Sequence, residues 1–269
     1  EKFENKEPVG TGPFTEISNF QAQSFDLLPN PEYWDDVKIA GVRILAFAGN
    51  DGANLAAING DVDWTQTYMP DIQSTYVDKD PEHRTFWFPP TGSEINWQLN
   101  TTLPMFSDPN VRKALSMAID REQVVDVGMS GYTIPADCTG LSGTYDEWRD
   151  ASIADDCTWT VRDIEGAAGT RTTPEGEPFA FNISVGSTST DWLSVANIIA
   201  QNLEDIGVTA TVDAPDWAAV VAGYETGEFQ SGIVWSDNAP TPWHYYRALM
   251  SSETLKPVGE QTFSNYHRF

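Results

Sequence analysis

The sequence has little positive charge, few histidines and only two cysteines. Its 269 residues include 15 lysines and arginines against 40 aspartates and glutamates, which gives a formal net charge of -25. This acidic field would repel a phosphate backbone or an anionic membrane surface, so nucleic acid is excluded as a partner. There is no CxxC motif and the three histidines, His83, His244 and His267, are scattered, so we expect no metal site and no cofactor.

Long hydrophobic runs are also missing. No stretch of about 18 apolar residues occurs, so we expect no membrane-spanning helix. The opening residues "EKFENKEPVG" do not have the basic and apolar regions of a secretory signal peptide. Either such a signal has been removed, or the chain is a piece of a longer protein.

The composition that remains is that of a globular protein, and its length allows more than one domain. Hydrophobic residues make up 40% and charged residues 20% of the chain. The first part is expected to be β-rich with irregular connections. It is predicted to hold a strand within 37–47, a short helix from 54 that ends near Gly60, a strand after that helix up to 66, and an aromatic strand over 83–90.

The later part reads as an α/β structure. A strand is expected at 95–102, followed by a helix with Ser107 or Asp108 as its N-cap and Pro109 near its first position. Residues 130–178 read mostly as loop. After them come a strand at 180–185, a helix at 191–207, a strand at 208–212, a helix at 216–227 and a strand at 229–235. This order predicts parallel pairing with right-handed crossovers.

The end of the last strand is a candidate ligand site. In open α/β sheets ligands bind beyond the carboxyl ends of the strands. Trp235 closes such a strand, the polar residues Ser236, Asp237 and Asn238 follow it, and Trp243 comes soon after. Tryptophan offers a large apolar face with one polar atom, which suits a half-wet cleft.

The two cysteines, Cys138 and Cys157, lie in an irregular segment rich in Gly, Asp and Thr. In an exported protein they are expected to form a disulfide. The alternative is two unrelated buried thiols.

Several motifs, in order along nearly the whole chain, resemble the family 5 extracellular solute-binding proteins of bacterial ABC transporters, in their dipeptide- and oligopeptide-binding group. The motif "LNTTLPMFSDPNVRKALSMAIDRE" (99–122) is the most specific match. The others are "PVGTGPF" (8–14), "NPEYW" (30–34), "AAINGDVDW" (56–64), "QNLEDIGV" (201–208) and "GEFQSGIVW" (227–235).

This resemblance implies a periplasmic-binding-protein-like fold of type II, a venus flytrap whose two lobes close on a solute. The chain would be an internal fragment with part of lobe I in 1–95 and most of lobe II in 96–269. It would be a monomer that delivers its solute to ABC transporter permease subunits. It would work in the extracellular or periplasmic space, anchored as a lipoprotein through a missing N-terminus.

The ligand class follows from a departure from the family pattern. Peptide binders of the family carry Trp-x-x-Asp-Tyr-x-Asp/Glu-Pro after this strand, and here Ser236 or Asp237 takes the place of the aspartate. Neutral hydrogen-bonding groups between tryptophans favour an oligosaccharide, and a di- or oligopeptide is the alternative. No GxSxG or HExxH motif occurs, so we do not expect an enzyme. A glycoside hydrolase, which needs two carboxylates about 5–10 Å apart, is the remote alternative.

The candidate ligand-binding residues are the polar turn and the tryptophans placed to line a cleft. For each tryptophan the alternative role is packing within or between the lobes. The candidates are Trp235, Trp243, Ser236, Asp237, Asn238, Trp97, Asn96, Trp64 and Trp217.

Overall fold

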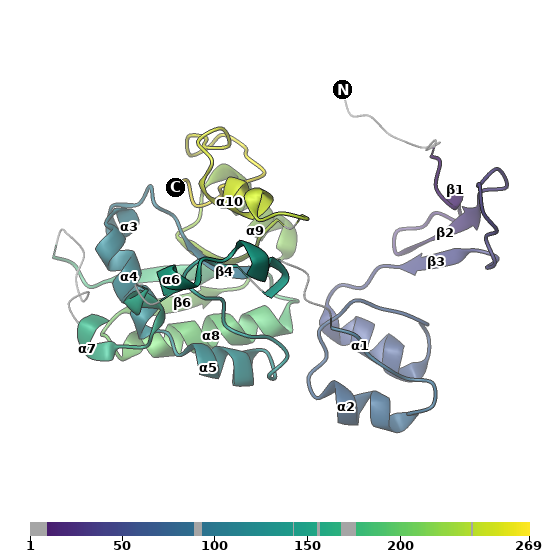
Figure 1. Ribbon diagram of the computed structural model, residues 1–269, viewed down its shortest axis with the longest axis horizontal. Coiled ribbons are helices and arrows are strands. Elements are labelled where there is room, and N and C mark those ends of the chain that lie inside the picture. The colour runs from purple at the N-terminus through teal and green to yellow at the C-terminus, as the bar shows by residue number, and fades with distance from the viewer. Residues whose placement is uncertain (1–9, 89–92, 142, 155–156, 168–175, 238) are drawn as a thin grey trace. The chain divides into compact units, whose positions relative to one another are not determined.

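The chain forms two compact units, residues 1–65 and 66–269, in a computed structural model (Figure 1). The structure describes residues 10–88, 93–141, 143–154, 157–167, 176–237 and 239–269. The unit boundary after Thr65 differs from the lobe boundary expected at residue 95. The division into lobes therefore stays a prediction.

The first unit contains a three-stranded antiparallel sheet. Its strands, in the order β1-β2-β3, are β1 (Phe14–Ser18), β2 (Ser24–Pro29) and β3 (Val42–Leu45). Asp26 of β2 lies opposite Arg43 of β3 and accepts a 2.7 Å hydrogen bond from its Nε atom. Asn19, in the left-handed region at φ 48°, donates a 2.6 Å bond to the same carboxylate. The strand predicted within 37–47 is confirmed as β3.

Helix α1 (Asn50–Asn59) completes this unit, and it ends at Gly60 as predicted. Gly60 adopts the left-handed conformation at φ 78° that closes a helix at glycine. The strand predicted after it is wrong, because residues 61–66 form no strand. The apolar and polar residues of that stretch alternate, but a strand needs a neighbour to satisfy its backbone groups.

The second unit begins with short helices rather than with the predicted aromatic strand. Helix α2 (Ile72–Thr75) and the 3-10 turn η1 (Val77–Lys79) precede residues 83–88, which are described and form no strand. Phe86 and Phe88 instead lie with their ring centroids 6.3 and 6.5 Å from that of Tyr132. This stretch therefore has ring contacts with Tyr132 in place of strand pairing.

A four-stranded mixed sheet is the centre of the second unit. Its strands, in the order β4-β7-β5-β6, are β4 (Ile95–Leu99), β7 (Ser231–Trp235), β5 (Ala180–Ser184) and β6 (Thr209–Asp213). β5 pairs in parallel with both β6 and β7, and β4 pairs antiparallel with β7. The predicted strands and their parallel pairing are confirmed.

Helices pack on both faces of this sheet. α4 (Pro109–Ala118) and α8 (Thr190–Glu204) share the main core with one face, and this core includes the fully buried Leu115, Leu203 and Ile233. α9 (Trp217–Thr226) packs on the other face, where Tyr224 contacts the cluster of Val234. Successive residues of a strand point to opposite faces, so Ile233 lies in the core beneath α4 and α8 and Val234 lies in the core beneath α9.

The remaining helices of this unit are short, apart from α10 near the end of the chain. Their bounds are α3 (Pro104–Ser107), α5 (Arg121–Gln123), η2 (Val124–Gly128), η3 (Gly143–Trp148), α6 (Ala151–Ala154), η4 (Thr158–Thr160), α7 (Ile164–Ala167) and α10 (Trp243–Met250). Within the described parts of the chain, no helix has the length and apolar character needed to cross a membrane.

Candidate functional site

Three tryptophans meet at the carboxyl edge of the parallel strands. Trp235 is the last residue of β7, Trp217 is the first residue of α9, and Trp192 lies in the first turn of α8. The ring centroid of Trp217 lies 5.4 Å from that of Trp192 and 6.0 Å from that of Trp235, and Trp192 and Trp235 are 6.2 Å apart. We call Trp192, Trp217 and Trp235 the tryptophan cluster.

The local sequence explains why these rings come together. Trp235 follows Ile233 by two residues and so points to the sheet face that α8 covers. Gly186, just beyond β5, leaves room for Trp217, since a Cβ atom there would lie 2.2 Å from the indole carbon Cε2. The indole Nε1 of Trp217 donates a 3.1 Å hydrogen bond to Ser189 Oγ, which fixes the ring's orientation.

All three members of the cluster keep some surface in contact with solvent. Trp235 is 37% exposed, and Trp192 and Trp217 are partly buried. An indole supported from behind by two others is held in place before any ligand arrives. Such preorganisation lowers the entropic cost of binding.

Ser236 follows the cluster but is occupied by contacts within the protein. It is 5% exposed, and its Oγ accepts a 2.8 Å bond from the backbone N–H of Glu94. Its own N–H donates to Glu94 O at 2.9 Å, and Ser93 Oγ donates to Ser236 O at 3.1 Å. Ser236 therefore ties the end of β7 to the start of β4, and its role toward a ligand stays a prediction.

Asp237 is exposed, and Asn238 lies outside the described residues. Trp235, Ser236 and Asp237 line a cavity of about 20 Å³ together with Gln98 and Tyr266. A cavity of this size holds about one water molecule, so it is not where a solute would bind.

Tyr266, which lines the same cavity, has a raised pKa. The cause is mainly burial, and the negative charges of Glu225 and Asp237 add to it.

Asn96 and Trp97 of β4 have mainly internal contacts. Asn96 Oδ1 accepts a 3.3 Å bond from the hydroxyl of Tyr245, and its Nδ2 donates to Glu94 O at 3.3 Å. Trp97 stacks on Phe181 with centroids 6.2 Å apart and packs against the main core. Both residues support the sheet beside the cluster, and a direct ligand contact by either remains a prediction.

Trp243 lies outside the tryptophan cluster, and Trp64 belongs to the other unit. Trp243 begins α10, is 59% exposed and lies edge-on to His244, while Arg247 sits 5.5 Å from its ring centroid. Trp64 belongs to the first unit and is 87% exposed. Their roles in binding stay predictions.

Trp192 was not among the predicted site residues. The available signal was its position two residues into a helix that follows a parallel strand, because such helices start at the ligand-binding edge. Its inward direction depends on how α8 crosses the sheet, which the sequence does not reveal.

Over the ranges that the structure describes, no group of three or more His, Cys, Asp or Glu residues could hold a metal ion.

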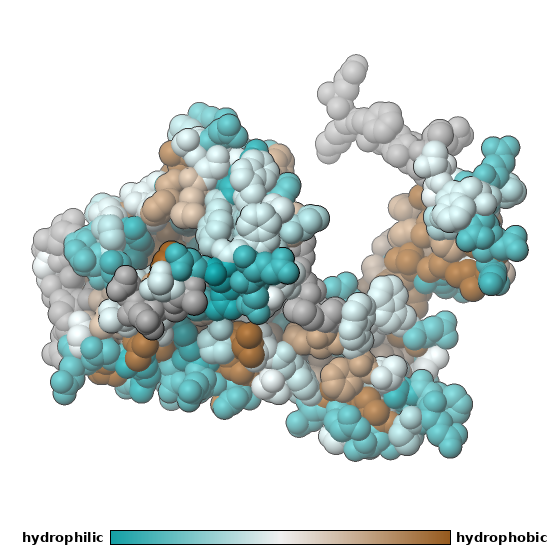
Figure 2. All heavy atoms as spheres, viewed as in Figure 1, coloured by the Kyte–Doolittle hydropathy of each residue, from teal (hydrophilic) through white to brown (hydrophobic). Residues whose placement is uncertain are grey.

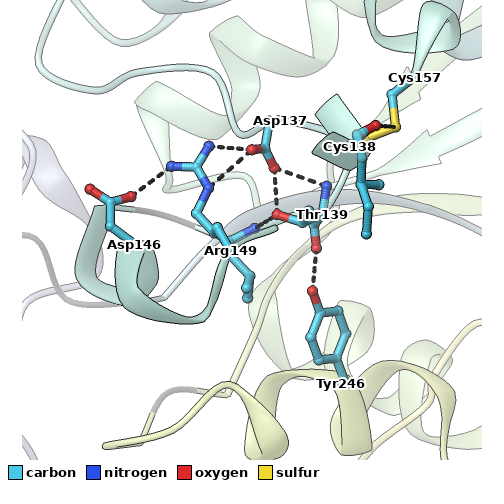
Figure 3. Close-up of polar contacts among 9 residues, drawn as sticks. Asp137, Cys138, Thr139, Asp146, Arg149, Cys157 and Tyr246 are labelled. Carbon is cyan, nitrogen blue, oxygen red and sulfur yellow. Dashed lines mark hydrogen bonds and ion pairs between the residues drawn. A yellow bond between two sulfur atoms is a disulfide. The ribbon is translucent and has the colours of Figure 1, made fainter. Parts of the chain in front are cut away.

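The disulfide between Cys138 and Cys157 is formed as predicted, with Cα atoms 5.7 Å apart (Figure 3).

The fold described above is an α/β fold of the type II periplasmic-binding-protein class. The sequence profile for the middle region of the bacterial extracellular solute-binding proteins, family 5, matches residues 1–256. The chain belongs to this family.

Solved structures and curated proteins agree with that assignment. The mannohexaose-bound periplasmic oligopeptide-binding protein of a Thermotoga maritima ABC transporter superposes with a TM-score of 0.86 at 20% identity, over 98% of this chain and 53% of that one. AppA of Bacillus subtilis with a nonapeptide gives a TM-score of 0.77 at 18% identity, over 96% of this chain and 54% of that one.

Among curated sequences, the oligopeptide-binding protein AppA of Bacillus subtilis is 22% identical over 236 residues, which are 82% of this chain and 42% of that protein. Protein XP55 of Streptomyces lividans is 28% identical over 154 residues, which are 55% of this chain and 27% of that protein. In these comparisons the chain covers between 27% and 54% of the length of the other protein.

Proposed function

We propose that this chain provides the solute-binding surface of an ABC importer and that its solute is a neutral oligosaccharide. The observation that carries the proposal is the tryptophan cluster at the carboxyl edge of β5 and β7, with Trp235 exposed at its front. Membership of the solute-binding family supports the importer role.

The physical basis is the two-sided character of a sugar ring. One face of a pyranose carries C–H groups that stack on indole, and each Å² of apolar surface buried contributes about 25 cal/mol. The hydroxyl groups at the ring edge need donors and acceptors, and the exposed carboxylate of Asp237 lies two residues beyond Trp235. The mannohexaose bound to the Thermotoga maritima relative shows that a similar fold accommodates such a ligand.

The remaining parts of the proposal follow from the importer role. The protein would work outside the membrane, in the extracellular or periplasmic space, as a monomer with a lipoprotein anchor. It would close two lobes on the solute and deliver it to the permease subunits. Closure would exclude water and strengthen the hydrogen bonds to the hydroxyl groups.

A di- or oligopeptide is the second candidate solute. It is favoured by Asp237, whose exposed carboxylate could pair with the α-amino group of a peptide, and by the nonapeptide complex of AppA. This mode of binding would depend on charge and would weaken in salt.

Calorimetry with a series of manno- and cello-oligosaccharides and unblocked tripeptides tests the proposal. We expect a sugar to bind and Trp235→Ala to weaken it by about 1–3 kcal/mol, the scale of one buried aromatic contact. Trp87→Ala is the matched control, because Trp87 lies in the same unit as Trp235, outside the tryptophan cluster, and is 85% exposed. It should leave affinity unchanged.

The same titrations distinguish the two solutes. Sugar binding should change little between low and high salt and should survive Asp237→Asn. Binding of an unblocked tripeptide that disappears in Asp237→Asn and persists in Trp235→Ala would reject the oligosaccharide in favour of the peptide.

A further inference from the structure

The segment from Asp137 to Cys157 is closed on itself twice. The disulfide joins Cys138 to Cys157, and Arg149 forms ion pairs with Asp137 and Asp146 (Figure 3). Burial acts to raise the pKa of Asp137, but hydrogen bonds from Thr139 and Arg149 outweigh it and hold that pKa below its usual value. The carboxylate is therefore charged at neutral pH and keeps Arg149 in place.

Tyr145, in η3, lies within the segment, and its side chain contacts Ala239, which is outside the segment. The side chain is 1% exposed. Its hydroxyl donates a 2.8 Å hydrogen bond to Ala239 O and accepts a 3.2 Å bond from Ala239 N. One phenol thus satisfies both backbone polar groups of a residue that lies four positions after Trp235.

A second contact joins the same segment to α10, which follows Ala239. Tyr246 donates a 2.8 Å hydrogen bond to Thr139 O (Figure 3). Tyr245 packs beneath Gly140, where a Cβ atom would lie 2.3 Å from the tyrosine hydroxyl. Leu141, Tyr145 and Tyr245 form one buried cluster. The segment therefore holds the chain at Ala239 and again in the first turn of α10.

We propose that Tyr145 is a positioning residue for the ligand-binding edge and that the disulfide-closed segment is the brace that holds it there. This rests on the proposed function of Trp235. The backbone leaving Trp235 is fixed first at Ser236 by Glu94 and next at Ala239 by Tyr145. Loss of the hydrogen bonds between Tyr145 and Ala239 frees the polar residues after Trp235, which a solute would meet. The core against which Trp235 packs stays intact.

The proposal distinguishes two roles for the disulfide. A purely stabilising crosslink acts mainly on the unfolded chain, so its removal lowers the unfolding temperature and leaves the native site unchanged. A brace acts on the native state, so its removal also loosens Ala239. Amide exchange at Ala239 reads this directly and needs no ligand.

The experiment compares Tyr145→Phe with Tyr132→Phe in the whole chain. Each variant loses a phenol hydroxyl that accepts a backbone hydrogen bond, but Tyr132 binds Ile72 N at 3.0 Å and lies outside the segment 137–157. We expect exchange of the Ala239 amide to rise about tenfold in Tyr145→Phe, because its hydrogen bond to the phenol is lost, and to change less than about twofold in Tyr132→Phe. Dissociation of the bound oligosaccharide should become about fivefold faster in Tyr145→Phe alone.

Opening the disulfide with a mild reductant should reproduce the increase at Ala239, and a Cys138→Ser, Cys157→Ser double variant should do the same. If the double variant does not fold, Tyr145→Phe and the reductant still test the brace. The proposal is overturned if Ala239 exchange is unchanged in a folded Tyr145→Phe protein, or if exchange rises with no change in ligand dissociation. If the unaltered chain binds neither sugar nor peptide, the proposed function fails, and the anchoring by Tyr145 is still judged by exchange at Ala239.

Discussion

The two compact units use different means to hold a sheet together. In the first unit none of the side chains of β1, β2 and β3 is buried. In the second, the first four residues of β7 are all buried, with Ile233 and Val234 serving cores on opposite faces. The first sheet is therefore held by backbone pairing and surface polar contacts, and the second by apolar burial.

Burial predicts which unit opens first. The buried apolar residues of the first unit, among those described, are Ala53, Ala56 and Ala57 of α1. Larger apolar side chains such as Ile44 and Phe47 remain 37% and 39% exposed, and Figure 2 shows hydrophobic surface gathered near β2 and β3. A small sheet without a buried face is marginally stable. Its amides should exchange through local opening, well before those of β5 and β7.

The largest expected effect compares a leucine of each unit. Leu203 of α8 is fully buried, so Leu203→Ala should lower the free energy of unfolding by about 2–5 kcal/mol through lost burial and a cavity. Leu28 of β2 is partly buried, so Leu28→Ala should cost about 1 kcal/mol and should speed exchange only in the first unit. Chemical denaturation followed by circular dichroism measures the first effect, and amide exchange measures the second. Equal costs for the two variants would show that the units do not differ as described.

The same contrast explains which elements the sequence could predict. Residues 180–235 carry strong local signals, and these agree with the structure: Asp216 caps α9 through a 3.1 Å bond from Ala219 N, and Gly227 ends it at φ 75°. The strands predicted after Gly60 and over 83–90 were wrong where the structure describes those residues. Both stretches have strand-like patterns, but a strand also needs a paired neighbour, which a local pattern does not contain.

For the site, sequence order was enough to place Trp235 at the ligand-binding edge. It could not reveal that Trp192 supports it, because that contact depends on the path of α8 over the sheet. Nor could it reveal that Ser236 is engaged by Glu94, which lies 142 residues earlier in the chain. Contacts across such separations arise only when the strands pair.

The next largest effect concerns a titratable group of the second unit. Burial, together with the charge of Arg112, lowers the pKa of His267 from 6.5 to about 4, and its Nδ1 lies 3.1 Å from Gln98 Oε1. The unfolded chain therefore binds a proton that the folded chain does not, and stability is lost as the pH falls from 6.5 towards 4. At about 1.36 kcal/mol per pH unit, the loss due to this residue approaches about 3 kcal/mol.

Urea denaturation at several pH values checks this prediction. The difference in stability between the unaltered chain and His267→Gln should change by about that amount between pH 7.5 and 4. Amide exchange in β1–β3 should not respond to the substitution, since His267 belongs to the other unit. A difference that stays constant with pH would show that His267 titrates normally.

A smaller effect is expected where the site meets the core. A Cβ atom at Gly186 would lie 2.2 Å from Trp217, so Gly186→Ala must displace that indole. Overpacking of this kind costs about 1–3 kcal/mol. Tryptophan fluorescence should shift as the cluster separates, and oligosaccharide affinity should fall. Gly12→Ala is the control, because among the described residues no atom lies within 4 Å of a Cβ placed there and its φ is not in the left-handed region. Unchanged fluorescence in Gly186→Ala would contradict the packing of Trp217 described above.

The smallest effect is expected in the first unit, at Asp26. Hydrogen bonds from Arg43 and Asn19 lower the pKa of Asp26 from 3.8 to about 2. The folded state therefore gains stability from this carboxylate above pH 3.8, and the gain is lost as the pH falls towards 2. Because the Arg43 side chain is exposed, solvent screens the pair, and Asp26→Asn should leave the global unfolding midpoint unchanged. It should still speed amide exchange across β2 and β3, where backbone pairing has little burial to assist it. Exchange in these strands that is indifferent to both Asp26→Asn and acid would mean that something other than the surface polar contacts holds the first sheet together.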